Sequence, residues 1–219
     1  MLKDLFLEIK SFVNGKSIDA LLPSILFVIL NQQFNLTIAI AGSLIFVLFT
    51  LIRRLLLKDN IKYSLFGLVS LLFASILAIL TNNPNTYFLP DLLTNLLIAL
   101  ASLISFILHK PIAAYASHLT RSWPLDWFWR NDIKPAYQEV SFIWFVFFGL
   151  KSMIQISNLL GSNINLGFIN LLLGFPFTLF VMSISYIYGI IRLKQLKGPS
   201  VEEFILKKEA PYKGQTKGF

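Results

Sequence analysis

Residues 139–160 read EVSFIWFVFFGLKSMIQISNLL, an apolar run long enough for a membrane helix, with one lysine, Lys151, in its interior. Gln155 follows one helical turn later and shares a helix face with this lysine. A lysine at membrane depth costs about 3 kcal/mol on insertion scales, so its side chain should face other helices or reach water. The stretch therefore predicts a membrane helix with a polar position inside it.

The whole chain has the composition of a membrane protein. Its 219 residues are 56% hydrophobic and 15% aromatic, and the mean hydropathy is +0.70. Long apolar blocks alternate with short polar clusters, which is typical of several membrane helices. The sequence predicts an all-α integral membrane protein, a bundle of six transmembrane helices. The expected spans are 18–33, 36–52, 63–80, 89–108, 139–160 and 166–191, the last with a kink at Gly174 and Pro176.

The basic residues predict the orientation of these spans. All but one of the 19 Lys and Arg residues fall in four segments, 3–16, 53–62, 109–138 and 192–219, and six spans place all four on one side. By the positive-inside rule this side is cytoplasmic, so both termini are expected in the cytoplasm. The net charge of +8 then indicates contact with the lipid bilayer and anionic lipid headgroups, not nucleic acid.

Three regions are expected along the chain. Residues 1–17 place apolar side chains at helical spacing and predict an interfacial amphipathic helix. Residues 18–193 form the six-span membrane domain, and residues 194–219 form a basic cytoplasmic tail. In the tail, Ser200 and Glu203 have the spacing of a capping box for a short helix, and the remainder from Lys207 is expected to be loose.

The segment 109–138 mixes tryptophan with basic residues, as interfacial segments do. Together with the basic connector after the second span, it predicts a belt of interfacial or lipid contacts. The residues expected in this belt are Arg53, Arg54, Arg121, Trp123, Trp127, Trp129 and Arg130.

A short motif recurs in the first and fourth spans. Leu-Pro-Ser at 22–24 returns as Leu-Pro-Asp at 89–91, each followed by a leucine-rich run. Because three spans separate the two copies, they are compatible with two inverted three-helix repeats. Chance similarity between leucine-rich spans is the alternative.

A candidate intramembrane polar site consists of Lys151, Gln155, Asp91 and Asn95. Asp91 begins the fourth span and Asn95 lies one turn deeper, at a depth close to that of Lys151. An ion pair between Lys151 and Asp91, bracketed by Gln155 and Asn95, is therefore one hypothesis. The alternatives are a water-exposed Asp91 at a helix N-terminus and a Lys151 that snorkels to the outer interface. A solute or ion pathway along these residues is a further reading of Lys151.

Catalytic and metal-binding motifs are absent from the sequence. The chain has no cysteine, and no HExxH, GxSxG or Walker pattern occurs. His109 and His118 are spaced too far apart for two ligands on one helix turn. The sequence therefore predicts no enzyme activity, no metal site and no cofactor.

Four segments carry a family resemblance: LLPSILFV at 21–28, RRLLLKDNIKYSLFGLVS at 53–70, YFLPDLLTN at 87–95 and WFVFFGLKSMIQ at 144–155. Over residues 18–193 the chain resembles a family of six-span bacterial membrane proteins of actinobacterial type, domain of unknown function 3159. It is distantly similar to the intracellular septation protein A group.

The resemblance implies a bacterial plasma membrane and a fifth-span pattern of tryptophan, a basic residue and glutamine, which Trp144, Lys151 and Gln155 match. Where the family pattern has arginine, Lys151 lacks the planar fork for a bidentate contact, which weakens an anion-clamping role.

Two functions are compatible with these features. The leading hypothesis is a small-solute or ion transporter, or a channel-like protein, built around the intramembrane polar residues. The alternative is a non-enzymatic envelope or division-associated scaffold, in which residues 109–138 and the tail bind an envelope protein or a second copy of the chain. A water-accessible cavity near Lys151 favours the first, and a filled bundle with an exposed apolar face on the 109–138 segment favours the second.

Overall fold

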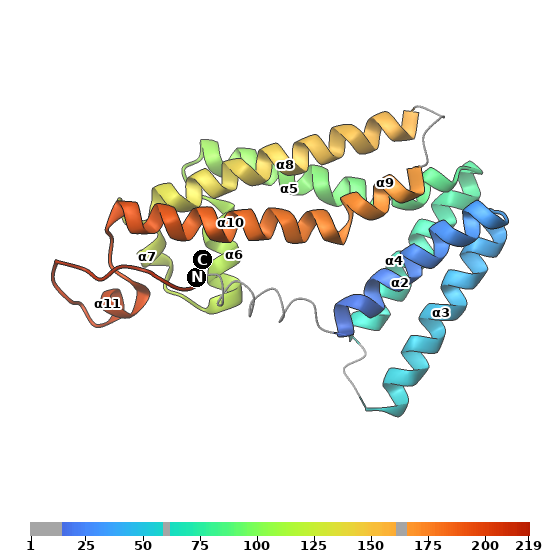
Figure 1. Ribbon diagram of the computed structural model, residues 1–219, viewed down its shortest axis with the longest axis horizontal. Helices are drawn as coiled ribbons and strands as arrows, with labels where there is room; N and C mark the ends of the chain where they lie inside the picture. The colour runs from blue at the N-terminus through green and yellow to red at the C-terminus, as the bar shows by residue number, and fades with distance from the viewer. Residues whose placement is uncertain (1–14, 59–61, 161–165) are drawn as a thin grey trace. The chain divides into compact units, whose positions relative to one another are not determined.

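The computed structural model describes residues 15–58, 62–160 and 166–219, and this part of the chain contains helices and no strand. The expected interfacial helix at residues 1–17 lies almost entirely outside the described residues, and residues 161–165, between the fifth and sixth expected spans, lie entirely outside them. Figure 1 labels the helices. They fall into two compact units, and each is described by itself.

The first unit comprises residues 95–152 and 178–219 of the described chain. It contains most of α5 (Leu89–Ile107), most of α8 (Lys134–Leu160) and most of α10 (Phe175–Leu196). Two shorter helices, α6 (Ile112–Arg121) and α7 (Leu125–Phe128), connect α5 to α8. A last helix, α11 (Val201–Ile205), belongs to the tail.

The core of this unit is built from the segment that the sequence assigned to the membrane interface. Trp127 and Phe128 are fully buried and pack edge-on against Tyr137 of α8. The Trp127 indole nitrogen donates a 2.9 Å hydrogen bond to the Pro199 carbonyl, which satisfies its polar end inside the protein. The lipid-facing role expected for Trp127 is therefore replaced by a core position.

The tail also belongs to this unit. Ser200 and Glu203 form the predicted capping box of α11, with both side-chain bonds present. The segment after Lys207, expected to be loose, is instead tied to the helices. The amides of Lys213 and Gly214 donate to the Glu203 carboxylate, and the ring of Phe219 stacks on that of Tyr137 with 4.3 Å between centroids.

Phe219 lies close to the helix backbone. A Cβ added at Gly189 of α10 would overlap the Phe219 ring, so this glycine makes room for the aromatic side chain. Arg121 donates from Nε to the Phe219 main-chain oxygen, and the Gly218 amide donates to the Tyr186 hydroxyl. Hydropathy alone predicted a loose segment because these contacts join residues far apart in the chain.

The second unit comprises residues 15–94 and 153–177, apart from the stretches that the structure does not describe. Its helices are α2 (Gly15–Gln33), α3 (Leu36–Leu56), α4 (Lys62–Thr81) and the 3-10 turn η1 (Pro84–Phe88). The end of α8, α9 (Leu166–Leu173) and the starts of α5 and α10 complete it.

An aromatic stack holds η1 against α2. The rings of Phe27 and Tyr87 are parallel, with 3.7 Å between centroids, and Phe88 packs edge-on against both. Ser43 of α3 donates a 3.1 Å hydrogen bond to the Pro23 carbonyl of α2. These contacts fix the turn after α4 and thereby position the first residues of α5.

The predicted kink in the last span is a helix break. The chain turns at Gly174, between α9 and α10, where the helical pattern is interrupted. Pro176 follows and has no amide to continue the ladder. The span therefore consists of two helices.

Helix α3 has one buried face and one exposed apolar face. One face buries Ala39, Ser43, Val47 and Arg54, whereas the opposite face exposes large apolar side chains. The exposed side chains are Ile45, Leu48, Phe49, Ile52 and Leu56. A continuous apolar stripe of this length is unfavourable in water and suits a lipid environment.

Four helical segments in the described chain are long and apolar enough to cross a membrane: 36–56, 84–107, 134–160 and 169–196. The other two expected spans appear as shorter apolar stretches, 22–33 and 67–81.

Candidate functional site

Buried polar side chains gather in the second unit where η1, the start of α5, the end of α8 and α9 meet. Asp91 lies in the first turn of α5, directly after Pro90, so its carboxylate is near the positive end of the helix dipole. The position follows from the sequence, because proline is tolerated in a first turn and a carboxylate is stabilised there.

Gln155 joins this carboxylate to α9. Its amide nitrogen donates a 2.8 Å hydrogen bond to Oδ2 of Asp91 and lies 3.5 Å from Oδ1 of Asn170. Gln155 and Asn170 are both buried, at 4% and 6% exposure. A hydrogen bond to an ionised carboxylate is stronger than one between neutral groups, so the Gln155–Asp91 bond is stronger than the contact between Gln155 and Asn170.

Asn158 lies three residues after Gln155 on α8 and is 8% exposed. Its amide nitrogen has no hydrogen-bond partner among the described residues. A buried amide without a partner costs about 1–3 kcal/mol, so this donor requires a partner from outside the described chain or destabilises the fold.

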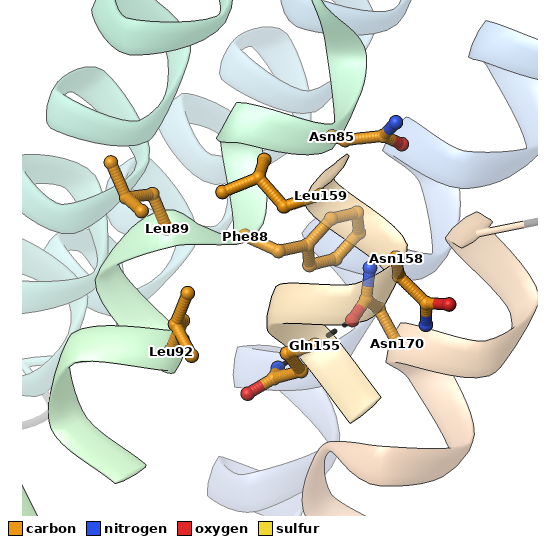
Figure 2. A pocket seen from close by; sticks show the side chains of 8 residues that line it. All are labelled: Asn85, Phe88, Leu89, Leu92, Gln155, Asn158, Leu159 and Asn170. Atoms are coloured by element: carbon orange, nitrogen blue, oxygen red, sulfur yellow. Dashed lines mark hydrogen bonds between the residues drawn. The ribbon is translucent and has the colours of Figure 1, made fainter. Parts of the chain in front are cut away.

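A cavity opens beside these amides (Figure 2). It encloses about 260 Å³ including its mouth. Asn85, Gln155, Asn158 and Asn170 supply its polar groups. Its apolar lining consists of Phe88, Leu89, Leu92 and Leu159. The interior holds about one water molecule, and the polar groups provide the number of partners such a water needs.

Figure 2 shows how the polar and apolar linings are arranged. The Asn158 and Asn170 side chains lie next to each other beside Gln155, whereas Leu89 and Leu92 lie on the opposite side of Phe88. The site therefore presents amide groups from one side of a mostly apolar hollow, a common design of pockets for small polar ligands.

The structure brings together two of the four residues that the sequence singled out, Asp91 and Gln155. Lys151 and Asn95 are also buried, at 1% and 2% exposure, and both belong to the other compact unit. The ion pair between Lys151 and Asp91 stays a prediction. The burial of Lys151 does not fit a side chain whose stem lies in lipid.

The sequence reasoning missed three amides of the cavity, Asn85, Asn158 and Asn170. The sequence contains features that could have identified two of these asparagines, Asn158 and Asn170. Asn158 follows Gln155 at the spacing that shares a helix face, and Asn170 is the polar residue of the apolar run LGFINLLLGF at 166–175. No spacing rule connects Asn170 with Asp91, because they come from separate helices.

The interfacial residues expected from the sequence have varied surroundings. Arg53 is exposed and Arg54 is buried in the last turn of α3. Arg121 lies 5.2 Å from the ring centroid of Trp123, and both are half-buried. Trp129 packs edge-on against Tyr115.

Arg130 forms a two-pronged ion pair with Asp132 at 2.7 and 2.9 Å. The hydrogen bonds that Arg130 donates to the Asp132 carboxylate raise the pKa of the Arg130 guanidinium, so the group stays charged.

Among the described residues, no group of three or more histidine, cysteine, aspartate or glutamate side chains is placed to hold a metal ion. The chemistry available in the cavity is hydrogen bonding by amides, with one carboxylate behind them.

Comparison with known proteins gives one match. No curated protein and no solved structure is similar to this chain. A family model matches residues 14–195, which include the cavity and Lys151 and end before α11. The chain belongs to a protein family of unknown function (DUF3159).

Proposed function

We propose that this protein passes a small polar solute or an ion across a membrane, and that the cavity lined by Gln155, Asn158 and Asn170 is part of the path. The observation that carries the proposal is the buried Asn158 amide without a partner at a cavity wall. Burying several amides inside apolar helices is unfavourable compared with apolar packing, and their presence is explained when a polar ligand occupies the cavity.

The small volume of the cavity limits which ligands it can hold. Space for about one water molecule suits an ion or solute that sheds most of its hydration shell, with amide oxygens and nitrogens replacing it. The Asp91 carboxylate accepts a hydrogen bond from Gln155, which lines the cavity. Its negative charge favours a cation or a solute that donates hydrogen bonds. Lys151, one turn before Gln155 on α8, adds a positive charge to the same helix.

The membrane topology that belongs to this proposal has six spans. The shorter apolar stretches of α2 and α4 serve as the first and third spans, beside the four long ones. With six spans the basic segments remain on one side, which supports cytoplasmic termini under the positive-inside rule. The membrane proposed for the protein is the plasma membrane of a bacterium. Two inverted three-helix repeats remain part of the proposal, and the broken last span resembles the discontinuous helices of transporters.

The test is a flux assay in liposomes with a panel of monovalent ions and small neutral solutes. We expect flux from the wild-type protein, and loss of most of it for Gln155→Met and Lys151→Met. Ser157→Ala is the matched control, because Ser157 is exposed on the same helix and lies outside the cavity lining. Wild-type flux no greater than that of empty liposomes across the panel would overturn the proposal.

A scaffold function is the second candidate, and one observation favours it. The first unit exposes Leu119 on α6 and Ile205 and Leu206 at α11, with exposures of 80%, 60% and 65%. Exposed apolar side chains of this kind are suited to a protein partner. A Leu119→Ser variant that keeps its flux but loses co-purifying envelope proteins would support the scaffold function.

A further inference from the structure

A second cavity lies in the first unit, between α11 and the tail that folds back on it. Its volume is about 200 Å³, smaller than the pockets of drug-sized ligands and large enough for a small anion. Its lining consists of Arg130, Pro199, Glu203, Phe204, Lys207, Lys208 and Tyr212. Six of these seven residues lie beyond the part of the chain that the family model matches.

The charged side chains that line the cavity leave it with a net positive charge. The Glu203 carboxylate accepts hydrogen bonds from the amides of Ser200, Lys213 and Gly214, and these bonds lower its pKa to about 2. Arg130 is paired with Asp132. Lys207 and Lys208 are the remaining charged groups of the lining, and their side chains make no ion pair or hydrogen bond within the described chain.

The two lysines are held at this place by the backbone. The amide of Lys207 donates to the Phe204 carbonyl, and the amide of Lys208 donates to the Glu203 carbonyl. These bonds close the turn after α11 and order the backbone from which both exposed lysine side chains extend. Binding of an anion there costs less conformational entropy than binding to lysines on a free chain, because the backbone is already ordered.

The aromatic walls give the cavity its shape. The Arg130 guanidinium carbon lies 6.0 Å from the ring centroid of Phe204 and 5.8 Å from that of Tyr212. The guanidinium thus orders both rings through cation–π contacts. Tyr212 comes from the folded-back tail, so the cavity exists only while the amides of Lys213 and Gly214 hold the tail on Glu203.

We propose that this cavity binds a phosphate-bearing anion, with Lys207 and Lys208 contacting the phosphate and Phe204 and Tyr212 covering the adjoining part of the ligand. Lysine is a common phosphate partner as a compact point charge with three donors. A soluble phosphate and the headgroup of an anionic lipid share this chemistry. The site is independent of the flux proposed above.

The test uses the full chain in two arms. In detergent the protein is titrated with inorganic phosphate by calorimetry, and in the second arm it binds phosphatidylcholine vesicles with and without phosphatidic acid. The Lys207→Gln/Lys208→Gln double variant is expected to bind about tenfold more weakly in the arm that contains the natural source. Lys194→Gln/Lys197→Gln is the charge-matched control, because both lysines are exposed and outside the lining.

Loss of binding by the Lys207→Gln/Lys208→Gln variant in the phosphate arm assigns a soluble ligand, and loss in the vesicle arm alone assigns a lipid headgroup. A third variant, Tyr212→Leu, keeps all charges and removes one wall, so it should weaken the binding of phosphatidic acid vesicles, whose lipid has a part that adjoins the phosphate. Equal loss in both double variants, wild-type vesicle binding by Tyr212→Leu, or no saturable binding of either probe by the wild type overturns the proposal.

Discussion

The side-chain amide of Gln155 donates a 2.8 Å hydrogen bond to the carboxylate of Asp91, which joins two helices whose residues lie 64 positions apart. The bond links the beginning of α5 to the end of α8 and leaves the neighbouring Asn158 amide facing a cavity without a partner.

Removing the Gln155–Asp91 bond should reveal energetic coupling. In a double-mutant cycle of Gln155→Ala and Asp91→Asn, we expect a coupling free energy of about 1 kcal/mol, since hydrogen bonds between membrane helices average somewhat less than that and a charged acceptor strengthens them. The measurement is the free energy of unfolding in a denaturing detergent series. Additive single effects would show that the bond contributes nothing to stability.

Replacing Asn158 by leucine should separate stability from function. Because the Asn158 amide nitrogen is buried without a partner, Asn158→Leu should leave the free energy of unfolding unchanged or raise it by about 1 kcal/mol. The same substitution should remove the proposed flux by filling a polar wall with an apolar side chain. A strongly destabilised Asn158→Leu protein would contradict this prediction, since it would mean that the amide already has a partner.

Phe219 should hold the tail on the first unit. Gly189→Ala introduces a Cβ that overlaps the Phe219 ring, so the tail should detach and trypsin should cleave faster at Lys213 and Lys217. Gly149→Ala is the control, because a Cβ at Gly149 meets no atom within 4 Å. Phe219→Ala alone should also speed cleavage, and adding it to Gly189→Ala should cause little further change. Unchanged cleavage in both single variants would mean that the ring does not retain the tail.

The tail should also detach in acid. Amide hydrogen bonds from Ser200, Lys213 and Gly214 lower the pKa of Glu203 from an ordinary value of 4.5 to about 2. A depressed pKa in the folded state means that this contribution to tail docking is complete above pH 4.5 and is lost as the pH falls through about 2. The Gly214 amide resonance in glycine-labelled protein should titrate with a midpoint near pH 2, and Glu203→Gln should abolish this titration. A midpoint near 4.5 in the wild type would show that the amides do not hold the carboxylate.

Some of the site was accessible to sequence reasoning. Asp91 and Gln155 were identified because a polar residue inside an apolar run has few structural explanations, and each was considered on its own helix. Asn158 and Asn170 were not identified, because asparagine is common near the end of a membrane span. That the two side chains meet depends on the packing of α8, α9 and η1.

For the tryptophan-rich segment 121–130 and for the tail, the tertiary structure differs from what the sequence led us to expect. Tryptophan beside arginine is the composition both of a membrane interface and of a folded core, so residues 121–130 fitted either. The hydrogen bond from Trp127 to the Pro199 carbonyl spans 72 positions and decides in favour of the core. Similarly, the tail looked loose because its own sequence has little apolar content, whereas Arg121 and Tyr137, which anchor Phe219, lie far away in the chain.

The sequence by itself determined that the chain is helical, where its apolar helices lie, where the last span breaks and how α11 is capped. These features depend on hydropathy, proline and glycine chemistry and contacts within one or two helical turns, which are all local. Only the tertiary structure decided which amides line the cavity, that Trp127 is buried and that Phe219 docks on Tyr137. Those contacts depend on long-range packing, whose partners no local pattern in the chain specifies.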